Sequence, residues 1–469
     1  MSASSPSHST NSPVHATSPS PTGVIASWRL LLFAFPATPH AFVVMPLMMV
    51  LPSFYAANTG VTLAQIALIA TLARLFDAAI DPVVGFLSDL TRSRLGPRKP
   101  WLIAAALICP LAILMLFQPP ADASVVYYTA FSLLLYVGFT FFEIPRAAWA
   151  AELTRDYTER SRVSIGVALA NISGSLVFWL MPLALWKLTG TTAITGTTLN
   201  AISWLYALLM PLGILLTVLL VPHGVPQLQK AGESAWRTLL QSVRQCRPLW
   251  RYVAVISCWG LGQGAFMSLI YIYIADHLKM GEKFPFLMIA YFITQLLAMP
   301  VWMRWLRHLE RHQAWSLSLA VNILASWAII WLPVGHESFY PALLIVFVTA
   351  FFNAPSNFLP TAILGDVIDY NSLKTGTNKA ANFYALNTMA IKITMALGTG
   401  AAFGVLAAGG YQVGKPNDST AYWGLIAAYL GIATVMHLVA AALAWTFPLT
   451  RRGHDIVRRR IERRAAASN

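Results

Sequence analysis

Apolar segments long enough to cross a lipid bilayer recur along almost the whole of this chain. A transmembrane helix needs about 20 predominantly apolar residues. We count twelve such segments, at residues 28–57, 61–88, 100–119, 125–151, 162–187, 198–221, 249–277, 284–306, 313–333, 338–365, 379–409 and 419–447. The chain is 57% hydrophobic and only 11% charged, which no ordinary soluble protein matches. The sequence therefore predicts an all-α membrane protein with twelve transmembrane helices.

A polar segment in the middle of the chain divides these helices into two groups of six. The predicted organisation is a disordered cytoplasmic tail (1–26), an N-terminal six-helix half (27–222), a cytoplasmic loop (223–248), a C-terminal six-helix half (249–448) and a basic cytoplasmic tail (449–469). The first tail is rich in Ser, Pro, Thr and His, and such a composition buries too little apolar surface to fold. Two six-helix halves with a site between them describe the major facilitator fold.

The distribution of Lys and Arg predicts the orientation. Basic residues gather in the loops after the even-numbered helices, whereas the odd loops hold only Lys187, Lys279, Lys283 and Lys415. Short basic loops remain in the cytoplasm, so we expect a multi-pass protein of the cytoplasmic (inner) membrane with both termini inside. The basic C-terminal tail lacks the interleaved aromatics of a nucleic-acid surface. We therefore expect contact with membrane lipid, no nucleic-acid partner, and a monomer.

Ionisable residues on the second helix carry the clearest functional signal. A charged side chain at the bilayer centre costs about 2.5–3.5 kcal/mol on insertion scales, so such groups mark functional sites. Arg74, Asp77 and Asp81 are three and four residues apart and share one helix face. Two carboxylates one turn apart can hold a monovalent cation or share a proton. The alternative is that the two aspartates pair with Arg74 and Arg146 and only hold helices together.

Charged residues also occur on the fourth and eleventh helices. Thr140, Glu143 and Arg146 are spaced by three, so Glu143 could complete a cation site or carry a proton, or could pair with Arg146 alone. Lys392 lies near the middle of the eleventh helix. A cation at this depth needs an acidic partner or an anionic ligand. We expect a carboxylate from the second or fourth helix.

Several motifs resemble those of one transporter family. Residues 76–82, 89–96 and 99–101 resemble the second helix and following loop of the glycoside/pentoside/hexuronide cation symporters, the family that includes the melibiose permease. Residues 140–145 resemble that family's Thr-x-x-Asp-Ile-Pro motif on the fourth helix, and the similarity returns at 366–370 and 374–392. The resemblance implies a major facilitator symporter.

The resemblance also implies roles for individual residues. Those at the cation-site positions are Asp77, Asp81, Thr140 and Glu143, with Lys392 beside them. The resemblance also places Asn387 and Asn357 close to the substrate cavity. Apart from the resemblance, we predict further substrate ligands among the charged and aromatic residues at membrane depth, so that the predicted set is Lys392, Asn387, Asn357, Arg74, Arg146, His40 and Trp149. We expect no catalytic residues, no metal centre and no cofactor, only a coupling ion, H⁺ or Na⁺.

Departures from the family pattern leave the substrate open. Sugar-transporting members carry an acid, an arginine and a tryptophan at the positions that hold Ala41, Ala168 and Ala147 here. Ile80 offers no oxygen between the two aspartates, and Glu143 replaces the family's aspartate. These changes favour protons over sodium as the coupling ion.

Charged residues at the cytoplasmic helix ends predict a conformational latch. Asp89 and the loop arginines Arg92, Arg94 and Arg98 resemble the inner-loop motif of major facilitator proteins, and Asp366 and Asp369 could pair with such arginines. The alternative is a solvated anchoring loop.

We therefore predict cation-coupled symport of a small organic solute, sugar-like or glycoside-like, by alternating access. The chief alternative is a carrier of lysolipids or other amphipathic or organic solutes on the same scaffold. An enzyme is not expected, because the chain has no His-Glu-x-x-His or Gly-x-Ser-x-Gly motif.

Overall fold

The structure is a computed structural model that describes residues 26–153, 157–222, 246–375 and 380–449. It contains twelve helical spans long and apolar enough to cross a membrane, and the described residues form no strand. The predicted fold class is thus confirmed. Most of the predicted tails and of the central loop (1–25, 223–245 and 450–469) lies outside the described residues.

The N-terminal half is formed by eight helices. They are α1 (Ser27–Ala34), α2 (Ala37–Met49), α3 (Leu51–Asn58), α4 (Leu63–Leu90), α5 (Lys99–Phe117), α6 (Val125–Glu152), α7 (Tyr157–Thr189) and α8 (Gly196–Leu220). The first predicted segment, 28–57, is broken twice, next to Pro36 and just before Pro52. Proline has no backbone N–H to continue the helical ladder.

The C-terminal half is interrupted more often. Its elements are α10 (Arg247–Tyr271), η1 (Ile272–His277), α11 (Phe284–Trp305), α12 (Arg311–Ser326), η2 (Trp327–Trp331), η3 (His336–Ser338), α13 (Phe339–Asn353), η4 (Ala354–Asn357), α14 (Leu359–Thr375), α15 (Ala380–Ala408), α16 (Ser419–Ile426), η5 (Ala427–Gly431) and α17 (Ile432–Trp445). The tenth predicted segment is two helices joined by the 3-10 turn η4, which contains Pro355. Irregular backbone at membrane depth is tolerated where it lines a cavity or is buried in protein, and η4 borders the cavity described below.

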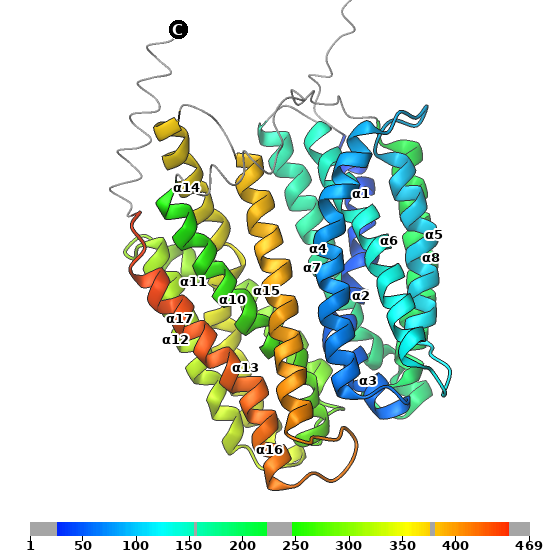
Figure 1. The fold of residues 1–469 in the computed structure, drawn as a ribbon, viewed down its shortest axis with the longest axis vertical. Coiled ribbons are helices and arrows are strands. Elements are labelled where there is room, and N and C mark those ends of the chain that lie inside the picture. Colours follow the sequence, from blue (N-terminus) through cyan, green and yellow to red (C-terminus); the bar gives the residue numbers. More distant parts are fainter. Residues whose placement is uncertain (1–25, 154–156, 223–245, 376–379, 450–469) are drawn as a thin grey trace, which may run out of the picture.

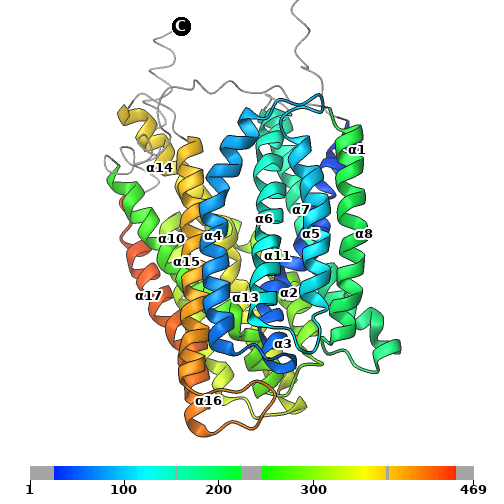
Figure 2. The same cartoon turned by 45° about the vertical axis from the view of Figure 1, so that its right-hand side comes forward.

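The two halves stand side by side. Figure 1 shows α1–α8 on one side of the molecule and α10–α17 on the other, with α4 and α15 adjacent at the boundary. The view in Figure 2 again places α15 beside α4. A second boundary contact joins α7 to α11. Helices far apart in the sequence therefore meet along the middle of the molecule.

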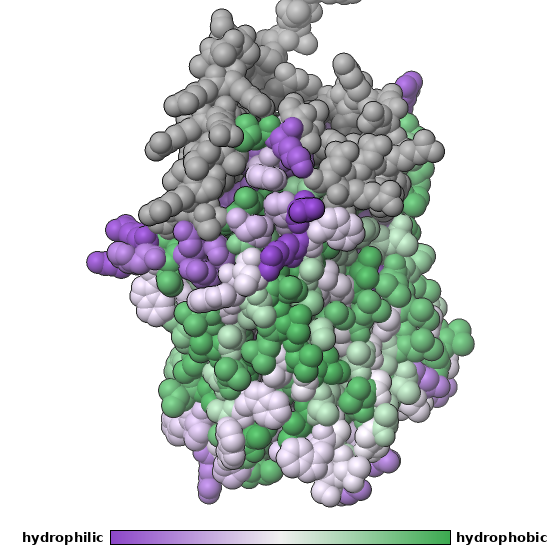
Figure 3. Space-filling model, turned by 60° about the vertical axis from the view of Figure 1, so that its left-hand side comes forward, coloured by the Kyte–Doolittle hydropathy of each residue, from purple (hydrophilic) through white to green (hydrophobic). Residues whose placement is uncertain are grey.

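The outer surface suits a lipid environment. Figure 3 shows a broad hydrophobic band below a region of charged side chains. Large apolar side chains on the membrane helices point outward, among them Leu107, Leu188 and Leu219, whose exposed fractions are 72%, 82% and 68%. So much exposed apolar surface is stable only against lipid or a partner. The chain is an integral, multi-pass membrane protein.

Contacts close the gap between the halves at one end of the molecule. We call the end that holds Arg92, Arg94 and Arg98 the basic end. At the opposite end the Thr191 hydroxyl donates a hydrogen bond of 2.8 Å to the Glu282 carboxylate. The Trp179 and Phe284 rings pack edge to face nearby, 5.4 Å apart. The two halves are thus joined at the opposite end.

Candidate functional site

A cluster of opposite charges lies at the boundary between the halves. The Lys392 ammonium of α15 is 2.7 Å from Asp81 Oδ2, 3.1 Å from Asp77 Oδ2 and 3.5 Å from Glu143 Oε2. The aspartates belong to α4 and the glutamate to α6. The expectation that Lys392 pairs with a carboxylate of the second or fourth predicted helix is confirmed, and it contacts both.

The three carboxylates have further polar partners. The Thr140 hydroxyl donates to Asp77 Oδ1 at 2.9 Å, so all four residues predicted for the cation site come together. Asp81 Oδ1 is buried and has no hydrogen bond from the described residues. Three acids around one lysine carry excess negative charge when all are ionised. The cluster can therefore accept a further proton or monovalent cation.

His40 lies beside this cluster. Its Nε2 is 2.9 Å from Glu143 Oε1, and its ring packs against Phe139 and Phe142 with centroid distances of 4.5 and 5.0 Å. Within the described part of the chain, the buried Nδ1 atom has no hydrogen-bond partner. His40, predicted as a substrate ligand, is thus a direct partner of an acid in the cluster.

Neither of the two arginines at membrane depth, Arg74 and Arg146, forms an ion pair with the acids. Arg74 donates from Nε to the Tyr136 hydroxyl at 3.2 Å, and the Arg146 guanidinium lies 4.7 Å from the centre of the Phe142 ring. Among the described residues, neither arginine lies within 4 Å of a carboxylate. The alternative that these arginines pair with the acids is wrong.

Trp149 was predicted as a substrate ligand, and this prediction is wrong. The side chain is 1% exposed, and its indole N–H donates to the Pro222 carbonyl at 3.2 Å. It packs edge to face on Phe33 inside the N-terminal half. Six residues separate Trp149 from Glu143, which corresponds to about 240° around a helix. Trp149 therefore faces away from the charge cluster.

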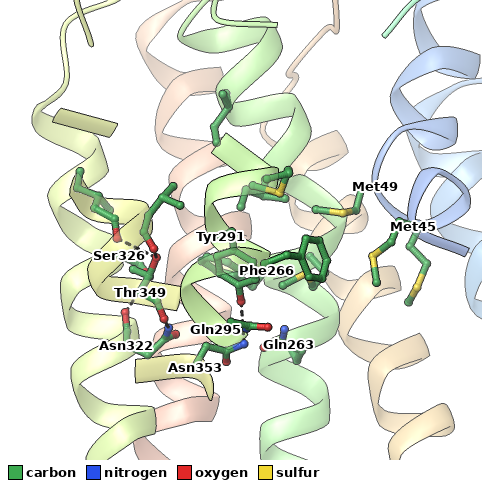
Figure 4. Close-up of a pocket in the computed structure, with 18 of the residues that line it drawn as sticks. Met45, Met49, Gln263, Phe266, Tyr291, Gln295, Asn322, Ser326, Thr349 and Asn353 are labelled. Carbon is green, nitrogen blue, oxygen red and sulfur yellow. Dashed lines mark hydrogen bonds between the residues drawn. The ribbon is translucent and has the colours of Figure 1, made fainter. Parts of the chain in front are cut away.

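A cavity of about 250 Å³ lies on the C-terminal side of the cluster. Asn357, one of the predicted substrate ligands, lines it, and so does Met395, three residues from Lys392 on α15. Figure 4 shows its polar and sulfur-containing side chains. Asn387 instead accepts a hydrogen bond of 2.7 Å from the Tyr252 hydroxyl and is absent from the lining of this cavity.

Sequence reasoning missed most of the cavity. Its carboxamides include Gln263, Gln295, Asn322 and Asn353, which belong to no recognisable motif. The only signal available was the presence of uncharged amides deep inside apolar segments.

At the basic end, two of the predicted latch acids, Asp89 and Asp366, form ion pairs within their own halves. Asp89 lies 2.6 Å from Arg98, which also contacts Glu152 at 2.6 Å. Burial lowers the pKa of Arg98, but its hydrogen bonds to Glu152 and Asp89 outweigh burial and raise it above the usual value. Arg92 and Arg94 are exposed and form no ion pair with the described residues. Of the three loop arginines predicted for the latch, Arg98 is therefore the one that forms ion pairs.

Asp366 of α14 also forms an ion pair within its own half. Asp366 accepts two hydrogen bonds from Arg311, of 2.6 and 2.9 Å. Its predicted pairing with arginines of the loop after the second helix is wrong, because Arg311 at the start of α12 is nearer. Asp369 lies one turn further along α14.

Comparisons with known proteins agree with this architecture. The sequence pattern of the family described as MFS/sugar transport protein matches residues 32–451. The chain is 22% identical to the uncharacterized symporter sll1374 of Synechocystis, over 86% of this chain and 91% of that protein. It is 23% identical to the putative glycoside/cation symporter YagG of Escherichia coli, over 77% of this chain and 78% of that protein.

A solved structure shares the fold. The nucleoside transporter NupG superimposes with a TM-score of 0.60 at 12% identity, covering 90% of this chain and 98% of that one. Both the relatives and the fold are those of transporters, and they are not enzymes. The chain belongs to the MFS/sugar transport protein family of major facilitator symporters.

Proposed function

We propose that this protein is a cation-coupled symporter of a small organic solute, sugar-like or glycoside-like, with H⁺ as the preferred coupling ion. One observation carries the proposal: Lys392 of one half lies among Asp77, Asp81 and Glu143 of the other half. These contacts can be made and broken as the halves move. The relatives named as symporters support the same conclusion.

Coupling follows from competition for the carboxylates. When Asp77, Asp81 and Glu143 are ionised, the Lys392 ammonium holds α15 against α4 and α6. A proton or cation that binds the acids weakens these ion pairs and frees the halves to rearrange. Ion binding raises the population of the conformational state that has the higher affinity for the ion. A substrate that also prefers this state then binds more tightly when the ion is bound. Symport is the result.

The surroundings of the acids favour protons. Asp77 already accepts a hydrogen bond from Thr140, and the ammonium of Lys392 occupies the space among the three acids. The His40 imidazole adds a second group that can bind a proton, directly beside Glu143. A sodium ion would need several oxygen ligands around an open position, so protonation requires less rearrangement.

Transport would proceed by rocking of the two halves around a site near the midplane. The contacts Thr191–Glu282 and Trp179–Phe284 close the opposite end, as expected of an inward-facing state. We assign the basic end to the cytoplasm because basic loops are retained there. Both termini would then be cytoplasmic, in the cytoplasmic membrane, and each monomer would contain a complete pathway.

A lysolipid carrier is the alternative on the same scaffold. The lining of the cavity is largely apolar, which would suit an acyl chain. The volume of about 250 Å³, however, is too small for a chain together with its headgroup. We therefore favour a compact solute.

Uptake into proteoliposomes tests the proposal. A panel of sugars, glycosides, glycerophospholipids and peptides is offered under an imposed pH gradient, a sodium gradient or neither. Accumulation of a sugar or glycoside should follow the pH gradient and be abolished by a protonophore. Asp77→Asn and Asp81→Asn should abolish accumulation, whereas Asp122→Asn, a change at an exposed loop carboxylate, should leave it intact. Full accumulation in both helix variants would refute ion coupling at this site.

A further inference from the structure

The cavity beside the charge cluster has two chemically distinct sides. Carboxamides and hydroxyls of the C-terminal half occupy one side, on α10, α11, α12, α13 and η4. Methionines of α2, in the N-terminal half, occupy the other. Figure 4 shows Gln263, Gln295 and Asn353 grouped together, with Met45 and Met49 across the cavity.

The carboxamide side is held in place by its own hydrogen bonds. Asn353 donates to the Tyr291 hydroxyl at 2.7 Å, and Asn357 donates to Gln295 Oε1 at 3.3 Å. Asn322 donates to the Thr349 carbonyl at 2.7 Å. Fixed donors and acceptors lower the ordering cost of binding. The side chains are therefore organised before a ligand arrives.

Hydrogen-bonding capacity remains for a ligand. Each carboxamide carries two donor hydrogens and an acceptor oxygen with two lone pairs, and each asparagine of this group uses one hydrogen in the bonds above. The Gln263 carboxamide forms no hydrogen bond with the described residues. Mixed donors and acceptors suit hydroxyl groups, since each hydroxyl both donates and accepts.

The cavity offers no charge to a ligand. None of the described residues that line it is Lys, Arg, His, Asp or Glu. The nearest cation on α15, Lys392, is already engaged by three carboxylates. An ionised substrate would leave water without gaining a counter-charge, at a high free-energy cost.

The remaining lining is apolar and aromatic. Met45, Met48, Met49, Phe266 and Trp259 belong to this part of the lining. Methionine is flexible and polarisable and forms favourable contacts with aromatic rings. The volume of about 250 Å³ lies just below the usual range for small-molecule pockets, roughly 300–1,000 Å³. It corresponds to a single sugar ring with a small substituent.

We propose that this cavity is the substrate site and that its ligand is an uncharged monosaccharide glycoside with an apolar or aromatic aglycone. The sugar hydroxyls bind the carboxamides of the C-terminal half, and the aglycone lies against the methionines of α2. This inference rests on the proposed transport function and adds to it a location and a substrate class. It places sugar recognition mainly in the C-terminal half, and it excludes glycosides that carry a carboxylate.

The position of the cavity gives the glycoside a route to the ion site. Met395 lines the cavity one helical turn from Lys392 on α15. A ligand held between α2 and α11–α13 contacts both halves and so responds to their relative motion. Movement of α15 that follows protonation of the acids would also change the cavity wall.

Binding of defined glycosides to the purified, full-length protein tests the inference without any ion gradient. The probes are 4-nitrophenyl β-D-glucoside, its galactoside and xyloside analogues, methyl β-D-glucoside and 4-nitrophenyl β-D-glucuronide. Affinity is measured by calorimetry in detergent. At least one neutral aryl glycoside should bind at least about tenfold more tightly than the methyl glycoside, because the aryl group buries apolar area. The glucuronide should bind at least about a hundredfold more weakly than the glucoside, since its charge is unpaired.

Variants localise the site. Gln295→Ala and Asn353→Ala should each weaken aryl glycoside binding by about tenfold, the usual effect of losing a buried hydrogen bond. Met45→Ala should lower the affinity for the aryl glycoside and leave the affinity for the methyl glycoside unchanged. Asn58→Ala, which removes a carboxamide at the exposed end of α3, is the matched control and should bind normally. Thermal melting of each variant separates loss of binding from loss of folding.

Four results would overturn the inference: no binding of any probe, equal binding of glucuronide and glucoside, unchanged affinity in both folded carboxamide variants, or equal effects of Met45→Ala on both glycosides. Gradient-driven uptake of another solute, without glycoside binding, would refute this inference and leave the proposed symport intact. Glycoside binding together with uptake that does not depend on ion gradients would support this inference and refute the proposed symport.

Discussion

The Lys392 ammonium on α15 lies 2.7 Å from the Asp81 carboxylate on α4, and this ion pair joins the two halves of the protein. Both side chains are largely buried, with exposed fractions of 21% and 15%. Asp77 and Glu143 share the same lysine. Removing only one partner of such a buried ion pair costs much free energy, because the other charge is left uncompensated. Protonation of the carboxylate releases the lysine at a lower cost, and ion coupling requires such a release.

Lys392→Met should destabilise the protein and abolish coupled uptake, because it leaves three carboxylates without their cation. Removing one partner of a buried pair costs about 3–5 kcal/mol. Thermal melting in detergent measures the loss. The double variant Lys392→Met/Asp81→Asn should recover part of the stability, since one uncompensated charge is removed. A double variant less stable than the single one would contradict the ion-pair account.

His40→Gln should change the pH dependence of uptake more than its maximal rate. The variant keeps a hydrogen-bonding group near Glu143 but removes the charge that His40 carries when protonated. Uptake is measured between pH 5 and 8 at constant gradient. His437→Gln offers a control, because His437 is buried on α17 and forms no hydrogen bond through its ring nitrogens to the described residues. Identical pH profiles for wild type and His40→Gln would exclude His40 from coupling.

Gly400→Leu should open the opposite end of the molecule. A side chain at Gly400 of α15 would collide with Thr71 of α4, so the halves would have to separate there. A cysteine introduced at Thr191 should then react several-fold faster with a membrane-impermeant maleimide from the side facing away from the basic end. Gly404→Leu is the matched control, since nothing lies within 4 Å of a Cβ at that position. Equal labelling in both variants would speak against closure at this contact.

Arg98→Ala should destabilise the basic end far more than Arg92→Ala. Arg98 is buried and contacts Asp89, Glu152 and Ser88, whereas Arg92 is exposed. Hydrogen bonds to charged groups contribute about 1.5–3 kcal/mol each. Because burial of Arg98 is outweighed by its hydrogen bonds to Glu152 and Asp89, which raise its pKa above the usual value, its contribution is fully present throughout the neutral range and is lost only in strongly alkaline solution. The difference in melting temperature between the two variants should therefore persist from pH 6 to 9.

Asp89→Ala should shift the balance between conformations without abolishing substrate binding. Asp89 contacts Arg98 at 2.6 Å but is itself largely exposed, so its removal weakens the latch and leaves the Arg98–Glu152 pair in place. Reactivity of cysteines introduced at the basic end reports the change. If both the cysteine reactivity and the glycoside affinity were unchanged, Asp89 would be only a solvated surface residue with no role in the latch.

The sequence by itself determined the membrane class, the number of membrane-spanning segments, the division into halves and the residues of the charge cluster. Hydropathy and charge belong to each residue wherever it lies, and an apolar segment of about 20 residues has few stable alternatives to a transmembrane helix. The spacing of Asp77 and Asp81 likewise places both on one helix face whatever surrounds them. The prolines at the helix breaks, Pro36, Pro52 and Pro355, are visible in the sequence, but the predicted segments were continuous there.

Only the tertiary structure decided which groups meet. In the folded protein the acids pair with Lys392, and not with Arg74 or Arg146. Trp149 is buried in the core of the N-terminal half. The tertiary structure also assembled the carboxamide cavity from α10, α11, α12 and α13. Contacts between residues hundreds of positions apart depend on the rotation and packing of whole helices, and neither is encoded in any single segment.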